Sequence, residues 1–104
     1  MIFRRRRFGD LIDRQLALFV EQHAELLREC EEAIAKYDAA ERESAEELYG
    51  DYVDLVETGT EALADMRDRF AQTLSERDAE EYEAEFNRAV AKKLPRFALE
   101  IENR

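Results

Sequence analysis

The chain has 104 residues, of which 40% are charged and 45% are apolar, so one domain with a thin hydrophobic core is expected. Its three glycines and one proline are too few for the turns of an all-β protein, and its six phenylalanines and four tyrosines are too many for a disordered chain. The formal net charge of −10 repels phosphate backbones, which argues against a dedicated nucleic-acid-binding protein.

Residues 1–9 are predicted to form a basic N-terminal arm. Its guanidinium groups lie between two phenylalanines, a combination that suits an anionic lipid surface, a nucleic acid or an acidic protein patch. The candidate anion-binding or partner-binding residues are Arg4, Arg5, Arg6 and Arg7. A frayed, solubilising or self-docking N-terminus is the interpretation that the short motif favours. No apolar stretch follows that is long enough for a secretory signal or a membrane span, so a cytoplasmic protein is expected.

An apolar stripe predicts a helix over residues 10–37. Its members recur every three or four residues on one side of the helix, and charged residues occupy the other side. They are Ile12, Leu16, Phe19, Val20, Leu26, Leu27, Cys30, Ile34 and Tyr37. The sole cysteine, Cys30, cannot form an internal disulfide and is interpreted as part of the core.

The only histidine, His23, lies in the middle of this stripe and invites a functional interpretation. Its neighbours on the same face, Phe19 and Leu27, can neither bind a metal nor relay a proton. If the first two helices pair antiparallel, His23 faces Gly59, which makes room for the ring, and Thr60, whose hydroxyl can bind a ring nitrogen. The sequence therefore favours a buried histidine that packs in the core.

A metal-binding or small-molecule-binding bundle is an alternative function. Helical bundles that hold two irons use Glu-x-x-His pairs, and this sequence contains none. Dimerisation would double the single histidine, so His23 stays a candidate ligand together with Glu57 and Glu61, which belong to an acidic row on the second predicted helix. No cofactor is expected otherwise. Because the sequence has no phosphate-binding loop, nucleophile elbow or zinc spacing, it favours a non-enzymatic protein.

The second predicted helix covers residues 44–74. Ser44 and Glu47 have the spacing of a capping box at its start, and its apolar stripe includes one charged residue, Arg67. The linker over residues 38–43 contains neither glycine nor proline, so one continuous rod is an alternative to a turn. The stripe changes phase across the linker, which favours an antiparallel hairpin.

The third predicted helix covers residues 78–94. Asp78 and Glu81 offer a second cap of this kind, and Pro95 ends the helix. The C-terminal tail, residues 95–104, carries three large apolar side chains. Because the third helix is too short to cover two helices of about 30 residues, we expect the tail to pack on the tip of its own hairpin or to be replaced there by a second subunit. The tip is lined by Cys30, Ile34, Tyr37, Ala45, Leu48, Tyr49 and Tyr52.

Residues 10–104 are therefore predicted to form one all-α domain, an up-down-up bundle made of an antiparallel hairpin of two long helices and a shorter third helix. Leu18, Leu55 and Met66 lie off the main stripes, which favours a homodimer or a higher homo-oligomer. The predicted function is a non-enzymatic helical module for self-assembly or for binding a partner helix, with acidic faces that set specificity. The alternatives are the metal-binding or small-molecule-binding bundle completed by dimerisation, and a peripheral membrane or nucleic-acid accessory protein that acts through the N-terminal arm.

Overall fold

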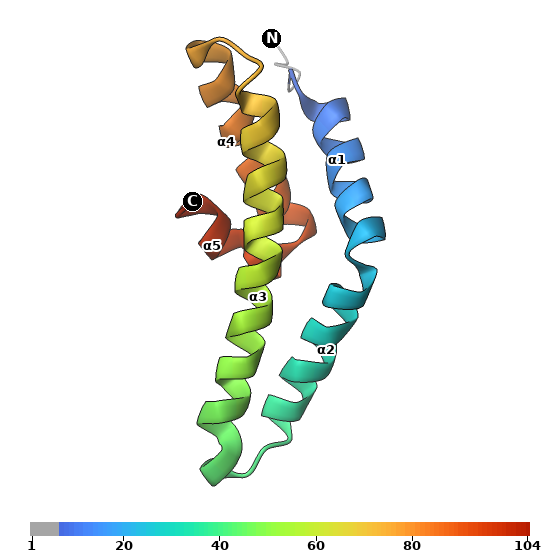
Figure 1. Cartoon of the computed structure of the whole chain (residues 1–104), viewed down its shortest axis with the longest axis vertical. Coiled ribbons are helices and arrows are strands. Elements are labelled where there is room, and N and C mark those ends of the chain that lie inside the picture. The colour runs from blue at the N-terminus through green and yellow to red at the C-terminus, as the bar shows by residue number, and fades with distance from the viewer. Residues whose placement is uncertain (1–6) are drawn as a thin grey trace, which may run out of the picture.

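The computed structural model describes residues 7–104, and all regular structure in this range is helical, which confirms the all-α prediction (Figure 1). The elements are α1 (Gly9–Gln22), α2 (Ala24–Asp38), α3 (Arg42–Ala71), α4 (Glu76–Lys93), the 3-10 turn η1 (Pro95–Phe97) and α5 (Ala98–Glu102). No helix in the described range is long and apolar enough to cross a membrane.

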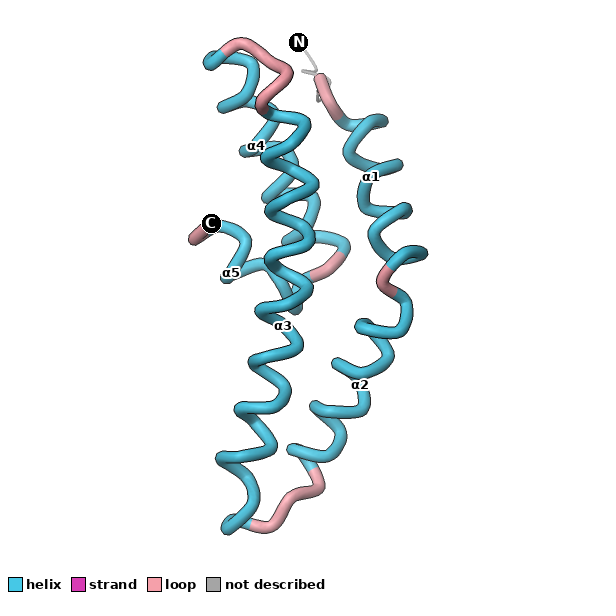
Figure 2. The backbone as a smooth tube through the Cα atoms, in the orientation of Figure 1, coloured by secondary structure: helices cyan, strands magenta, loops and turns pink. Residues whose placement is uncertain are grey.

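Two helices, α1 and α2, replace the single helix predicted over residues 10–37, because the chain bends at His23 (Figure 2). The backbone of His23 has φ −116° and ψ 30°, outside helical values. Its N–H still donates to the Phe19 carbonyl at 2.9 Å, and its carbonyl accepts the Leu27 N–H at 3.0 Å, so these two hydrogen bonds survive the bend. Since α1 packs on α4 and α2 packs on α3, the bend lets one apolar stripe follow two partners.

The next two helices, α2 and α3, lie side by side and run in opposite directions, so the alternative of one continuous rod is wrong. The predicted capping box at Ser44 does not form, because α3 begins earlier, at Arg42. Glu41 holds the N-cap position without a side-chain capping bond, and its carbonyl accepts the Ser44 N–H at 3.0 Å. The first turn is therefore closed by the backbone, and α3 ends at Ala71, short of the predicted residue 74.

The fourth helix begins at Glu76 rather than at residue 78. Its cap is Ser75, whose hydroxyl oxygen accepts the Asp78 N–H at 3.2 Å. The predicted cap Asp78 is instead a first-turn residue, where its negative charge complements the helix dipole. The helix ends at Lys93 because Pro95 has no N–H and restricts the backbone of the residue before it.

The hydrophobic core lies where α1, α3 and α4 meet, in the upper half of Figure 1. Tyr82 is fully buried at its centre, with its ring 4.8 Å from that of Phe70 and its hydroxyl donating to Gln15 Oε1 at 2.8 Å. Burial raises the pKa of Tyr82 to about 12. The buried apolar residues of this core are Ile12, Leu16, Phe19, Val56, Leu63, Ala64, Ala71, Tyr82, Phe86, Ala89, Val90, Phe97 and Ile101.

The C-terminal tail packs on its own chain, with its apolar side chains beside the middle of α3 (Figure 1). Of the residues predicted to line the hairpin tip, it contacts Tyr52, through Arg96. Phe97 and Ile101 are 1% and 0% exposed. The buried Arg67 of α3 donates through Nη1 to the Ile101 carbonyl at 3.2 Å and to Asn87 Oδ1 at 3.0 Å. The prediction was wrong for the apolar residues of the tail because it assumed that the tail continues along the direction of α4, whereas the chain turns at Pro95.

Gly59 and Thr60 do not form the predicted site for His23, whose ring is only half-buried. The space at Gly59 is taken by Phe97, because a Cβ added at residue 59 would lie 2.5 Å from Phe97 Cε1. The Thr60 hydroxyl donates to the Val56 carbonyl at 2.8 Å, inside its own helix. Gly59 therefore makes room for the Phe97 ring of the C-terminal tail, a contact that the sequence pattern did not predict.

The two glycines of α3 provide a matched pair of substitutions. Gly50→Ala meets no heavy atom within 4 Å and is expected to stabilise the fold by about 0.5–1 kcal/mol, because alanine favours helix. Gly59→Ala gains the same propensity but overlaps the buried Phe97 ring, and such overpacking costs about 1–3 kcal/mol, so we expect a net loss. Urea unfolding measures both changes. A stabilising Gly59→Ala would show that the ring moves aside freely.

Candidate functional site

The lower half of the α2 and α3 hairpin, residues 24–55, projects away from the core (Figure 1). We call this part of the hairpin the arm, which is distinct from the predicted N-terminal arm. Cys30 is its only fully buried residue, whereas α3 from Val56 to Ala71 contains seven buried residues. Burial raises the pKa of the Cys30 thiol, which keeps it unreactive. Two helices alone leave parts of their apolar stripes uncovered. The arm is therefore thinly packed and exposes Tyr49, whereas the other exposed large apolar residues of the described chain, Leu18, Val20 and Leu99, lie outside it.

One side of the arm carries the tyrosine face, defined as Tyr37, Tyr49 and Tyr52. The Tyr49 ring lies 5.0 Å from that of Tyr37 and 6.1 Å from that of Tyr52, and Tyr49 is 47% exposed. Arg96 of η1 closes the upper end, where its Nε donates to Tyr52 Oη at 3.1 Å and its Nη2 to Glu31 Oε2 at 2.8 Å. The three rings themselves carry no charge, and the carboxylate of Glu31 beside the upper end is paired with Arg96.

A second side of the arm carries the apolar groove, about 210 Å³ in volume, between α2 and α3. Its apolar members are Ala33, Leu48 and Leu55, and its polar members are Glu29, Glu32, Lys36 and Asp51. The two leucines are two helical turns apart, so they line the same side of α3. Leu55, which lies off the main apolar stripe, therefore lines this groove.

The arm also holds most of the chain's excess negative charge. Residues 24–55 contain eleven acidic and three basic residues, a net charge of −8, compared with −10 for the whole chain. Charge of one sign on a projecting element attracts partners of the opposite sign and repels identical copies. The arm therefore combines few buried residues with most of the net negative charge of the chain.

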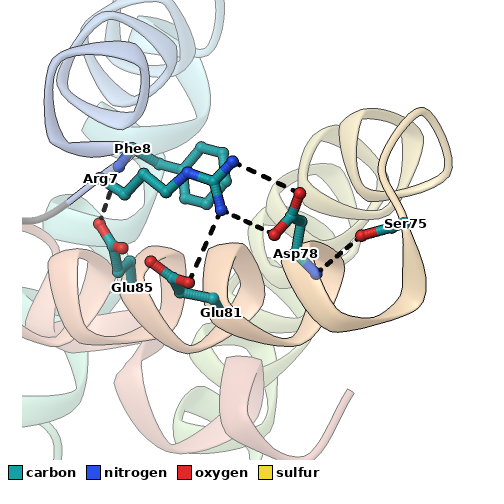
Figure 3. A network of polar contacts seen from close by, with 6 residues as sticks. All are labelled: Arg7, Phe8, Ser75, Asp78, Glu81 and Glu85. Carbon is teal, nitrogen blue, oxygen red and sulfur yellow. Dashed lines mark hydrogen bonds and ion pairs between the residues drawn. The ribbon is translucent and has the colours of Figure 1, made fainter.

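Among the four candidate arginines, Arg7 is engaged within its own chain (Figure 3). Its Nη1 donates to Asp78 Oδ1 at 2.7 Å and lies 3.9 Å from Glu81 Oε1, and its guanidinium lies 5.1 Å from the centroid of the Phe8 ring. The hydrogen bond from Arg7 lowers the pKa of Asp78. The self-docking interpretation therefore describes Arg7. The other three, Arg4, Arg5 and Arg6, lie outside the described residues.

The sequence pattern did not single out Glu85, which is 4% exposed and holds the start of α1 (Figure 3). Its Oε1 accepts the Phe8 N–H at 3.2 Å, at an N-cap position that has no capping side chain of its own. A carboxylate between Tyr82 and Phe86 in an otherwise apolar stripe was the available signal. Glu85 and Asp78 together anchor the beginning of the described chain on α4.

The candidate metal ligands are not brought together within one chain. Across residues 7–104, no group of three or more His, Cys, Asp or Glu side chains is arranged to hold a metal ion. The His23 ring stacks on Phe19, with centroids 4.8 Å apart. Glu57 and Glu61 are exposed on α3, and Glu61 lies 3.9 Å from Arg104. A metal site completed by a second subunit therefore stays a prediction.

No protein-family model matches the sequence, and no curated protein or solved structure is significantly similar to it. The function is therefore inferred from the surfaces of the chain itself.

Proposed function

We propose that the chain is a non-enzymatic helical self-assembly module, and that its arm pairs with the arm of a second copy through the tyrosine face. The observation that supports this is the exposed Tyr49, which lies at the centre of three neighbouring tyrosine rings on a two-helix element. Tyrosine is enriched in interfaces because it buries a large ring and keeps a hydroxyl for hydrogen bonding. Two paired arms would form the four-helix bundle that one arm cannot form alone.

The size and charge of the arm set the expected strength of the dimer. With 15 residues, α2 is about 22 Å long, and two adjacent helices are about 20 Å wide. The flat footprint is then roughly 400 Å², small beside the roughly 800 Å² per partner of a standard interface. Two arms of charge −8 also repel each other. We therefore expect a dimer that dissociates on dilution and becomes tighter as salt screens the repulsion.

Sedimentation equilibrium over a dilution series tests this proposal. The wild-type mass should rise from 12.2 kDa toward twice that value as concentration increases, and more readily at high salt. Tyr49→Gln removes a ring from both sides of a two-fold interface, so it should weaken dimerisation by at least about tenfold. The control is Leu99→Gln, because Leu99 lies on α5, outside the arm, and is 74% exposed.

Two results would reject the proposed dimer. One is a constant mass of 12.2 kDa at all concentrations and salt levels. The other is a Tyr49→Gln variant that dimerises as well as Leu99→Gln and the wild type. Elemental analysis of the purified protein checks the metal-binding alternative in the same experiment.

A further inference from the structure

We infer that the apolar groove is a separate docking surface, and that it binds a basic amphipathic helix from a partner protein. The groove and the tyrosine face are made of different residues, because no residue of the tyrosine face lines the groove. Occupying it would therefore not require breaking the proposed dimer. This adds a heterotypic partner to a chain whose proposed function is self-assembly.

The apolar part of the groove matches the repeat of a helix. Leu48 and Leu55 are seven residues apart on α3, which corresponds to about 10.5 Å along the axis, and Ala33 of α2 lies in the same groove. A partner helix with apolar residues at positions i, i+4 and i+7 presents anchors over the same length. The small Ala33 side chain leaves room for a larger one from the partner. The apolar residues of the groove therefore match the length of about two turns of an amphipathic helix.

The charged residues of the groove determine whether a basic or an acidic partner fits. Glu29 of α2 and Asp51 of α3 flank the apolar residues from opposite helices, and neither forms an ion pair within residues 7–104. Glu32 is already bound by Arg28, and Lys36 is the single basic residue that lines the groove. Lysines or arginines beside the apolar anchors of a partner would pair with the two remaining carboxylates.

A second copy of the chain is a poorer occupant of the groove than a basic helix. Two identical grooves would bring the carboxylates of Glu29 and Asp51 against each other. On the tyrosine face, the corresponding carboxylate of Glu31 is neutralised by Arg96. Charge complementarity therefore assigns the tyrosine face to a second copy and the groove to a basic partner.

Fluorescence anisotropy with the full-length protein tests this assignment. The probe is a labelled synthetic 18-residue peptide of leucine and lysine, patterned as an amphipathic helix, and a scrambled peptide of the same composition is its control. We expect the patterned peptide to bind at least about tenfold more tightly than the scrambled one, and its affinity to fall as salt rises. This salt response is opposite to the one expected for the dimer, so the two proposals can fail separately.

Two variants of the groove separate binding in the groove from general attraction to an acidic protein: the first keeps the charge of the groove and the second removes part of it. Leu48→Gln combined with Leu55→Gln should weaken binding of the patterned peptide at least about tenfold, whereas Tyr49→Gln should leave it unchanged. Because both leucines are half-buried, circular dichroism must show that the double variant is folded. The exposed pair Glu29→Gln and Asp51→Asn provides a second variant, which should bind more weakly and with a shallower salt dependence.

Three outcomes would overturn the inference. The scrambled peptide could bind as tightly as the patterned one, or both groove variants could bind the patterned peptide like the wild type. Either result would show that peptide binding is a non-specific attraction between opposite charges. Tyr49→Gln could abolish peptide binding while the groove variants keep it, which would move the site to the tyrosine face.

Discussion

Replacing Phe97 by alanine is expected to lower the free energy of unfolding by about 3–5 kcal/mol, as for other buried phenylalanines. The ring is 1% exposed, lies 5.9 Å from the ring of Phe19 and fills the space above Gly59. It therefore joins α1, α3 and the C-terminal tail at the level of the bend at His23. Its removal leaves a cavity at the junction of these elements, where the thin core has little other packing to replace it.

Thermal unfolding measures this loss. For a domain of this size, about 1 kcal/mol corresponds to roughly 4–8 °C, so Phe97→Ala should lower the melting temperature by more than about 10 °C. Leu99→Ala is the control, because Leu99 belongs to the same tail but is 74% exposed and should change stability by less than about 0.5 kcal/mol. Equal effects of the two variants would show that the tail does not pack as described.

Replacing Arg67 by alanine is expected to lower the free energy of unfolding by about 2–4 kcal/mol. Its side chain is 4% exposed, and Nη1 donates to the carbonyl of Ile101 and to Asn87 Oδ1. Alanine leaves the buried Ile101 carbonyl without its donor, which costs about 1–3 kcal/mol, and also removes the packed stem of the side chain, whereas the partly buried Asn87 can bind water instead. The partly exposed Asp68, which pairs with Arg67 Nε at 2.8 Å, becomes hydrated at little cost.

Urea unfolding with hydrogen exchange separates the parts of this effect. Arg69→Ala is the control, because Arg69 is exposed on the same helix and should cost less than about 0.5 kcal/mol. Loss of the bond to Ile101 should also speed exchange of the α5 amides before global unfolding. If Arg67→Ala unfolds at the same urea concentration as Arg69→Ala, the buried guanidinium contributes nothing measurable to the fold.

The sequence determined the features that depend on short stretches of chain. Helical periodicity placed long helical segments on either side of residues 38–43, because apolar residues three and four apart share a helix face whatever the fold. Pro95 ended α4 through its own ring and missing N–H. The sequence pattern also placed Arg67 inside the apolar stripe of the second helix, although it did not show which groups bind it. The local pattern around residues 29–36 and 48–55 likewise contained the apolar and acidic residues of the arm, although it did not show which of them share a groove.

Only the tertiary structure decided where these segments meet. The bend at His23 has neither glycine nor proline beside it. It lies where the packing partner of the chain changes, because α1 packs on α4 and α2 packs on α3. Arg7 and Asp78 are 71 positions apart in the chain, and their ion pair could not be derived from either local motif. Phe97 occupies the space at Gly59 that the sequence pattern had assigned to His23. Such contacts depend on the direction in which each helix leaves its turn, and this direction is fixed by packing between distant segments rather than by local preference.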